Sequence, residues 1–266
     1  MIDTLSVAYE HREAFRICYA AASKYISNNV KIYNTNFKKF KNKIEQPLLQ
    51  LAADKLSAVF GYELINTVGI EFEFFIYAQT GNSGGTDFIF DDNPEISFLI
   101  NFNRNLRALY KKDIRNFCLA LADIYTHELI HCVQYIKQYK SVGIKEDQLK
   151  ESLFKNKEHL FKHDIRYNTI KQYMEDLPYF SKHEELVCYS KDAARQLLTY
   201  YKDKKIILSK LSNVDTLTDL SKASDCFYYY YDCFYIKVPG LTQQYDFLWK
   251  KFIKHLCRNL NEEFAI

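Results

Sequence analysis

Two histidines stand four residues apart around a glutamate in the segment His127-Glu128-Leu129-Ile130-His131. Residues at this spacing project from the same face of a helix one turn apart, so both imidazoles can bind one metal ion. Glu128 follows the first of them directly, where it can take a proton from a metal-bound water. Zn²⁺ lowers the pKa of its bound water to about 7, which makes that transfer feasible at neutral pH. The segment therefore predicts a Zn²⁺ site with a catalytic base.

This pattern is not expected by accident in a chain of this composition. Random order of its seven histidines and its glutamates would produce about 0.01 such matches. The alternative is an accidental match on a buried helix, but buried His and Glu side chains are costly unless they are paired or bind a metal. The metal site is therefore the favoured interpretation.

The motif lies in a segment with the period of one long, largely buried helix. From about Asp113, which can cap the helix, to Tyr139, apolar residues mostly recur every three or four positions. Three strands are predicted before it. Apolar side chains alternate over 70–77 and again over 96–102, and the glycine-rich segment 80–85 is expected to be a hairpin connection into a strand at 87–90.

Helices are predicted on both sides of this block. The first spans 4–27 and the second 47–60, with Pro47 in its first turn, where a missing N–H costs nothing. The tyrosine-rich segment 226–236 is predicted as an additional strand. The remaining predicted helices span 145–161, 181–201, 206–222 with a break near Asn213, and 242–261.

A strand block followed directly by the HExxH helix resembles the zincin metallopeptidases, including small phage-encoded zincin-like proteins. The similarity covers about residues 66–200 and rests on His127 to His131 and on element order. It implies an α+β fold in which a small, mostly antiparallel sheet precedes the active-site helix, with helical N- and C-terminal additions. It also implies that 96–102 is an edge strand whose backbone binds the substrate, through the side of Ser97, Leu99 and Asn101 or the opposite side.

The expected organisation follows from this resemblance. It comprises an N-terminal helical region at 1–64, a zincin-like catalytic core at 65–202 and a C-terminal, mainly helical region at 203–266. The sequence contains no sharp linker, so we expect these regions to form one compact unit.

The resemblance also bears on the third metal ligand. Gln134 and Lys137 stand where the metzincin pattern needs Gly and His, so that branch is excluded. The gluzincin branch takes a Glu from a later helix, and Glu184 and Glu185 supply two candidates. Ser181 and Glu184 have the spacing of a capping box, which gives Glu184 a structural role and makes Glu185 the favoured ligand. Glu184 is the alternative ligand. If neither residue binds the metal, both are ordinary acidic residues in the first turn of a helix.

Other residues were weighed for the same site. Glu185-Leu186-Val187-Cys188 matches the gluzincin Glu-x-x-Ala only loosely, with Cys188 for the small residue. Some zincins use a third His, but the required spacing is absent. His159 and His163 favour a solvated helix face instead, and His183 is the remaining histidine of this group. Several tyrosines could stabilise an oxyanion without one being preferred, namely Tyr167, Tyr173, Tyr179 and Tyr228 to Tyr231.

Composition limits the partners and the compartment. The net charge is only +3, and the lysine-rich segment 38–43 is expected to be a solvated helix face, so no nucleic-acid partner is expected. Seven cysteines without a CxxC pair indicate reduced core residues in a cytosolic protein. No secretion signal or membrane span is predicted. The composition resembles that of proteins from AT-rich genomes, including phages, which would make the location virion-associated instead of cytoplasmic.

The leading hypothesis is a cytoplasmic zinc metallopeptidase that acts on a peptide or protein. His127, His131 and Glu185 would hold Zn²⁺, and Glu128 would activate water for attack on the peptide carbonyl. The rival hypothesis is a zincin-fold structural or interaction protein, for example a phage particle component with a protein assembly partner. Its metal site would be non-catalytic or latent.

Overall fold

The computed structural model describes residues 6–25, 33–62, 69–77, 83–89, 95–103, 114–142, 179–235, 242–262 and 264. Their side chains are described for 6–25, 38–62, 114–137, 179–183, 185–235, 245–262 and 264. The chain divides into two compact units. The first comprises Met1–Leu149 and Glu263–Ala265, and the second comprises Lys150–Glu262 and Ile266. This division falls inside the segment 65–202.

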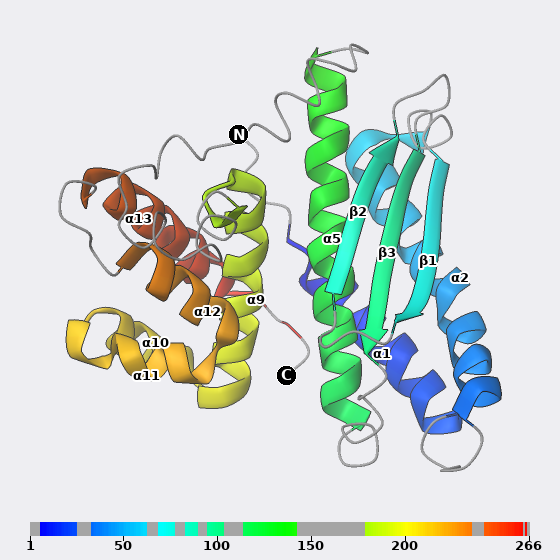
Figure 1. Ribbon diagram of the computed structural model, residues 1–266, viewed down its shortest axis with the longest axis horizontal. Coiled ribbons are helices and arrows are strands. Elements are labelled where there is room, and N and C mark those ends of the chain that lie inside the picture. Colours follow the sequence, from blue (N-terminus) through cyan, green and yellow to red (C-terminus); the bar gives the residue numbers. More distant parts are fainter. Residues whose placement is uncertain are drawn as a thin grey trace. The chain divides into compact units, whose positions relative to one another are not determined.

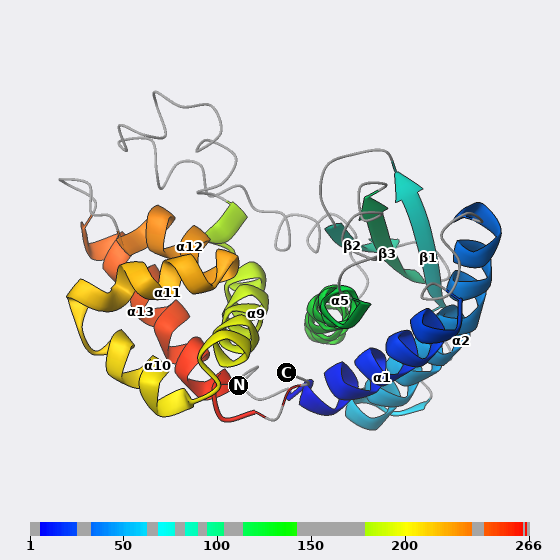
Figure 2. The same ribbon diagram turned by 90° about the horizontal axis from the view of Figure 1, so that it is seen from below.

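The first unit contains the helix that carries the HExxH motif. Its elements are α1 (Ala8–Tyr25), α2 (Tyr33–Phe60), β1 (Gly69–Tyr77), β2 (Ser83–Ile89), β3 (Glu95–Asn103) and α5 (Ile114–Val142). Helix α5 packs against β2 and β3 and also against α1, while α2 packs against α1 and β1 (Figure 1). Figure 2 looks along α5 and shows the strands and α1 on different sides of it. The long buried helix predicted for the motif is confirmed.

Helix α2 begins at Tyr33, fourteen residues before the predicted start at Pro47. A proline inside a helix removes a backbone hydrogen bond and costs about 3 kcal/mol. Here one apolar stripe with a four-residue spacing continues through it and is at most 2% exposed. The stripe consists of Phe40, Ile44, Leu48, Ala52 and Leu56. Burial of this stripe outweighs the cost of the proline.

The three strands occur where the sequence predicts them, but their pairing differs. The sheet order is β1-β3-β2, with β1 parallel and β2 antiparallel to β3. The predicted hairpin between the first two strands is therefore wrong, and Ser83 to Gly85 lie in β2. The edge-strand prediction for 96–102 is also wrong. Because β3 lies between two partners, both of its backbone sides are occupied by ladder pairing and cannot bind a substrate strand.

The predicted α+β, zincin-like fold class is wrong. Of the residues whose side chains are described, 90% are helical and none lies in a strand. The sheet among the described residues has three strands and mixed pairing, whereas the resemblance implied a mostly antiparallel sheet. Strand alternation reveals which face of a strand is buried but not which strand is its neighbour.

The second unit is helical throughout its described residues. It contains α9 (His183–Tyr201), α10 (Lys204–Leu211), η2 (Val214–Thr216), α11 (Leu217–Ala223), α12 (Asp225–Tyr230), η3 (Tyr231–Tyr235) and α13 (Thr242–Asn259). Helix α9 packs against α10, α11, α12 and α13. The predicted break near Asn213 is confirmed, since the Asn213 side chain accepts a hydrogen bond from Asp215 N and starts a new turn.

The predicted strand at 226–236 is wrong, because α12 and the π-helical turn η3 span it. Ser224 caps α12 by accepting from the backbone N–H of Phe227 at 3.0 Å. Phe227, Tyr230 and Phe234 then recur at helical spacing and are fully buried. The period of the buried aromatic residues overrides the strand preference of tyrosine.

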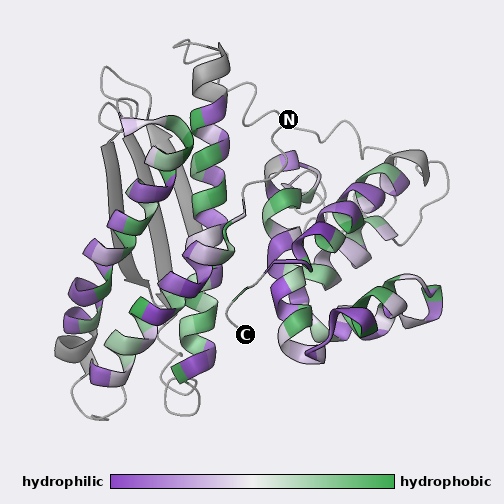
Figure 3. Cartoon of the chain, turned by 180° about the vertical axis from the view of Figure 1, so that it is seen from behind, coloured by the Kyte–Doolittle hydropathy of each residue, from purple (hydrophilic) through white to green (hydrophobic). Residues whose placement is uncertain are grey.

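The helices of both units are amphipathic, with hydrophilic and hydrophobic residues interspersed along them (Figure 3). None of the helices in the described ranges is long and apolar enough to cross a membrane. All seven cysteines lie in the described ranges and are free thiols, and five of them are buried. Phe264 belongs to the first unit, where its ring packs edge-on against His11 with centroids 5.6 Å apart.

A pH dependence follows from the buried thiols between α1 and α5. Burial raises the pKa of Cys118 to about 12 and that of Cys18 well above its usual value. Unfolded thiols titrate near pH 9, so the folded state binds more protons between pH 9 and 12 and the free energy of unfolding falls as pH rises through this window. Between pH 8 and 10, the free energy of unfolding measured with urea should fall by about 1 kcal/mol less in Cys118→Ala than in wild type. Equal losses would contradict the shift.

Candidate metal centre

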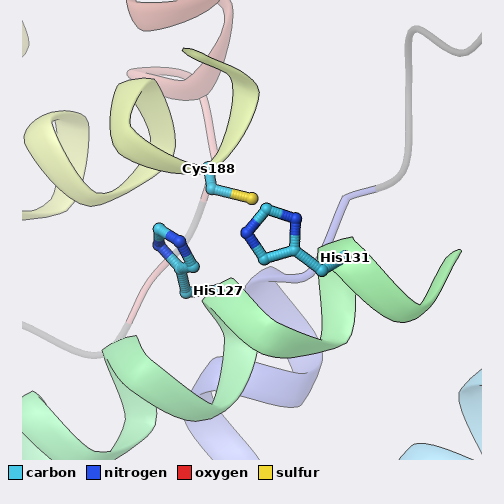
Figure 4. A group of neighbouring side chains, drawn as sticks. All are labelled: His127, His131 and Cys188. Atoms are coloured by element: carbon cyan, nitrogen blue, oxygen red, sulfur yellow. The ribbon is translucent and has the colours of Figure 1, made fainter. Parts of the chain in front are cut away.

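Helix α5 places His127 and His131 side by side on one face. Their ring centroids are 5.0 Å apart, and one ring nitrogen of each lies within 4.8 Å of the other (Figure 4). Tetrahedral Zn²⁺ holds two imidazole nitrogens about 3.4 Å apart. Small rotations of the two side chains therefore bring this pair to the separation that zinc requires.

The surroundings of the pair are largely dry. Glu128 and His131 are 4% and 5% exposed, and His127 is half-buried. Three apolar residues of the same helix, Leu129, Cys132 and Val133, are at most 2% exposed. In such a low-dielectric environment, interactions between a cation and its ligands are stronger than in water. Two imidazoles and an adjacent carboxylate fit the chemistry of zinc.

Two neighbours on α5 hold the ring of His131. The Nδ1 atom of His131 lies 3.1 Å from the Oε1 atom of Gln134. The ring of Tyr135 stacks on the imidazole with centroids 5.9 Å apart and an interplanar angle of 16°. The side chains three and four residues further along the helix thus fix the orientation of this imidazole.

A buried polar pair that sequence reasoning missed lies one turn before His127 on the same helix. His11 of α1 is fully buried, and its Nε2 atom lies 3.1 Å from Oδ1 of Asp123 on α5. Two features of the sequence could have indicated this pair. They are a histidine on an apolar helix and an aspartate four residues before His127. The pair ties α1 to the segment of α5 that carries the HExxH motif.

The start of α9 bears on the two glutamates. The helix begins at His183 with Lys182 as its N-cap, and the Lys182 side chain makes no capping hydrogen bond. Ser181 stands one position before the N-cap, and the side chain of Glu184 lies outside those described. The capping box of Ser181 with Glu184, and with it the preference for Glu185 as the ligand, stays a prediction.

Glu185 is 8% exposed and lies among aromatic residues of the second unit. Its carboxylate accepts a hydrogen bond from the hydroxyl of Tyr179. Burial and the nearby charge of Glu185 raise the pKa of Tyr179. A hydrogen bond to one carboxylate oxygen is compatible with metal binding by the other, because ligating carboxylates are commonly hydrogen-bonded in turn. The role of Glu185 as a ligand stays a prediction.

Cys188 lies three residues after Glu185 on α9 and is fully buried. Its side chain is labelled in Figure 4, on helix α9. Sequence reasoning treated Cys188 only as a substitute for a small residue. The available signal was a thiol, which is a strong zinc ligand, on the same helix face as Glu185.

The other residues considered for the site are placed as follows. His159, His163, Tyr167 and Tyr173 lie outside the described residues. The ring of His183 lies 6.0 Å from that of His255 on α13, both within the second unit. Tyr230 is fully buried and donates a hydrogen bond to the backbone oxygen of Phe180, which is a structural role. Lys38, Lys39 and Lys43 are exposed on α2, as the predicted solvated face requires.

Comparison with known proteins does not assign the chain to a family. No protein-family model, curated protein or solved structure matches it. The chemistry of the residues on α5 is therefore the basis for assigning a function.

Proposed function

We propose that this chain is a zinc-dependent hydrolase in which His127 and His131 bind the metal and Glu128 is the general base. The observation that carries the proposal is the adjacent pair of imidazoles on one face of α5, 5.0 Å between centroids, with the buried Glu128 next to them. Zinc bound there would lower the pKa of a coordinated water to about 7 and polarise a substrate carbonyl. Glu128 would accept the proton and later deliver it to the leaving group.

Peptide bonds are the first substrate to test, because the HExxH motif resembles that of zinc metallopeptidases. The proposal does not depend on a zincin fold or on substrate pairing with β3. It needs only the two ligands, the base and access for a carbonyl group. A reaction of another hydrolase class, acting on an ester or amide, would use the same three residues.

A third ligand is required for firm binding, and we propose that α9 supplies it. Glu185 is the residue predicted from the sequence, and Cys188 is the alternative on the same helix face. A thiolate binds zinc at about 2.3 Å and a carboxylate at about 2.0–2.2 Å, so both types are compatible with tetrahedral zinc. Substitution and chemical labelling can separate them.

Metal analysis of the purified chain tests the proposal. We expect one equivalent of zinc per chain after dialysis, and affinity reduced on the order of 100-fold or more in His127→Ala and in His131→Ala. His183→Ala is the matched control, because it removes a half-buried histidine of the second unit and should retain zinc. Purified protein that cannot be loaded with zinc would refute the site.

Alkylation with iodoacetamide identifies the ligand from α9. If Cys188 binds zinc, adding a chelator should accelerate its alkylation, while Cys233, buried in the core of the second unit, should stay unreactive. If Glu185 is the ligand, Glu185→Ala should lose zinc and Cys188→Ala should keep it. Full zinc affinity in both variants would show that α9 supplies no ligand.

A further inference from the structure

We propose that Gln134 is a positioning residue for the metal ligand His131. Its side-chain carbonyl holds the imidazole in the tautomer with the proton on Nδ1, so that Nε2 presents its lone pair to the metal. This inference rests on the proposed function, which it deepens by assigning a role to a residue outside the HExxH motif.

The geometry fixes the direction of the hydrogen bond. The contact joins Nδ1 of His131 and Oε1 of Gln134 at 3.1 Å. A carbonyl oxygen can only accept, so Nδ1 must carry the proton. A neutral imidazole has a single N–H group, and Nε2 is therefore the nitrogen whose lone pair can bind a cation.

The surroundings strengthen this preference. His131 and Gln134 are 5% and 6% exposed, so water competes little for their contact. The Nε2 atom of Gln134 has no hydrogen-bond partner within the described ranges, which leaves the bond to His131 as the one that orients the amide. Tyr135 stacks on the imidazole of His131 and restricts its rotation. An imidazole that is already oriented loses less conformational entropy when it binds a metal.

Two substitutions at this position separate the effect of the hydrogen-bond acceptor from the effect of side-chain volume. Gln134→Met has a similar size and no carbonyl, and zinc affinity should fall about 10- to 100-fold, as is usual when the partner of a ligating histidine is removed. Gln134→Glu keeps an oxygen acceptor in the same place and should retain affinity within a few-fold of wild type. Competition with a chromophoric chelator measures both, and thermal unfolding checks that each variant is folded.

The tautomer itself can be read without any metal. Long-range ¹H–¹⁵N spectra of the metal-free full chain with ¹⁵N-histidine report which ring nitrogen carries the proton, and the His131 signals are assigned by their absence in His131→Gln. We expect the proton on Nδ1 in wild type and in Gln134→Glu, and a shift of population toward Nε2–H in Gln134→Met.

The outcomes distinguish this inference from the proposed function on which it rests. A wild-type chain that binds zinc but carries the His131 proton on Nε2 would overturn the role of Gln134 alone. So would a Gln134→Met variant with unchanged zinc affinity. A chain that binds no zinc would overturn the proposed function, and with it the ligand role that Gln134 is inferred to support.

Discussion

Replacing Glu128 with glutamine is expected to slow hydrolysis by about 10²- to 10⁴-fold while zinc stays bound at one equivalent per chain. The amide has nearly the shape of the carboxylate but cannot accept a proton, so the base is lost and the buried surface is kept. The measurement is kcat/KM on casein or a fluorogenic peptide library, with zinc content determined on the same preparation. A substitution that removes general-base catalysis should lower kcat more than it raises KM.

Glu10→Gln is the matched control for this prediction. Glu10 is 5% exposed in the same unit and pairs with Lys55 at 3.1 Å on the α1–α2 side. It should keep its turnover per bound zinc. Undiminished hydrolysis in Glu128→Gln would remove the proposed base. A wild-type chain that binds zinc but hydrolyses none of the substrates would favour the non-catalytic, assembly-type metal site instead.

Replacing Phe252 with alanine is expected to destabilise the second unit by about 3–5 kcal/mol. Phe252 is fully buried on α13, and its ring stacks on that of Tyr230 with centroids 4.2 Å apart and an interplanar angle of 4°. Truncation removes this contact and leaves a cavity in the aromatic core. Urea unfolding of the full chain, followed by tryptophan fluorescence, reports on this unit because the only tryptophan, Trp249, lies next to Phe252.

Phe247→Ala provides the control on the same helix. Phe247 is 63% exposed, so the same truncation should change the free energy of unfolding by no more than about 0.5 kcal/mol. If the two variants unfolded at the same urea concentration, the burial of Phe252 and the exposure of Phe247 on α13 would be contradicted.

Apolar periodicity predicted the helices well because a helix with one buried face has apolar residues every three or four positions in the sequence. Helices α1, α5, α9 and α13 all lie where the apolar spacing indicates them. The sheet shows the limit of this signal. Alternation located β1 and β3, and the glycine-rich segment led to the prediction of a strand at 87–90, which overlaps β2. Nothing in the spacing reveals that β3 lies between the other two, so both the hairpin and the edge strand were wrong.

The candidate site divides in a similar way. His127, Glu128 and His131 were predictable because a motif on one helix needs only the geometry of that helix. The choice between Glu184 and Glu185 depends on where α9 begins and on the partner of the Ser181 side chain, which the local spacing of residues does not determine. Contacts between distant segments, such as that of His11 with Asp123, leave no local pattern and become visible only in three dimensions.

The packing of Phe264 in the first unit affects how the chain folds during its synthesis. The first unit contains segments from both sides of Lys150–Glu262 in the sequence. The edge-on packing of Phe264 on His11 therefore cannot form until the whole of Lys150–Glu262 has left the ribosome. Until then, the end of α1 that carries the partner of Asp123 lacks this aromatic cover. The first unit is thus completed only after the second unit has been synthesised.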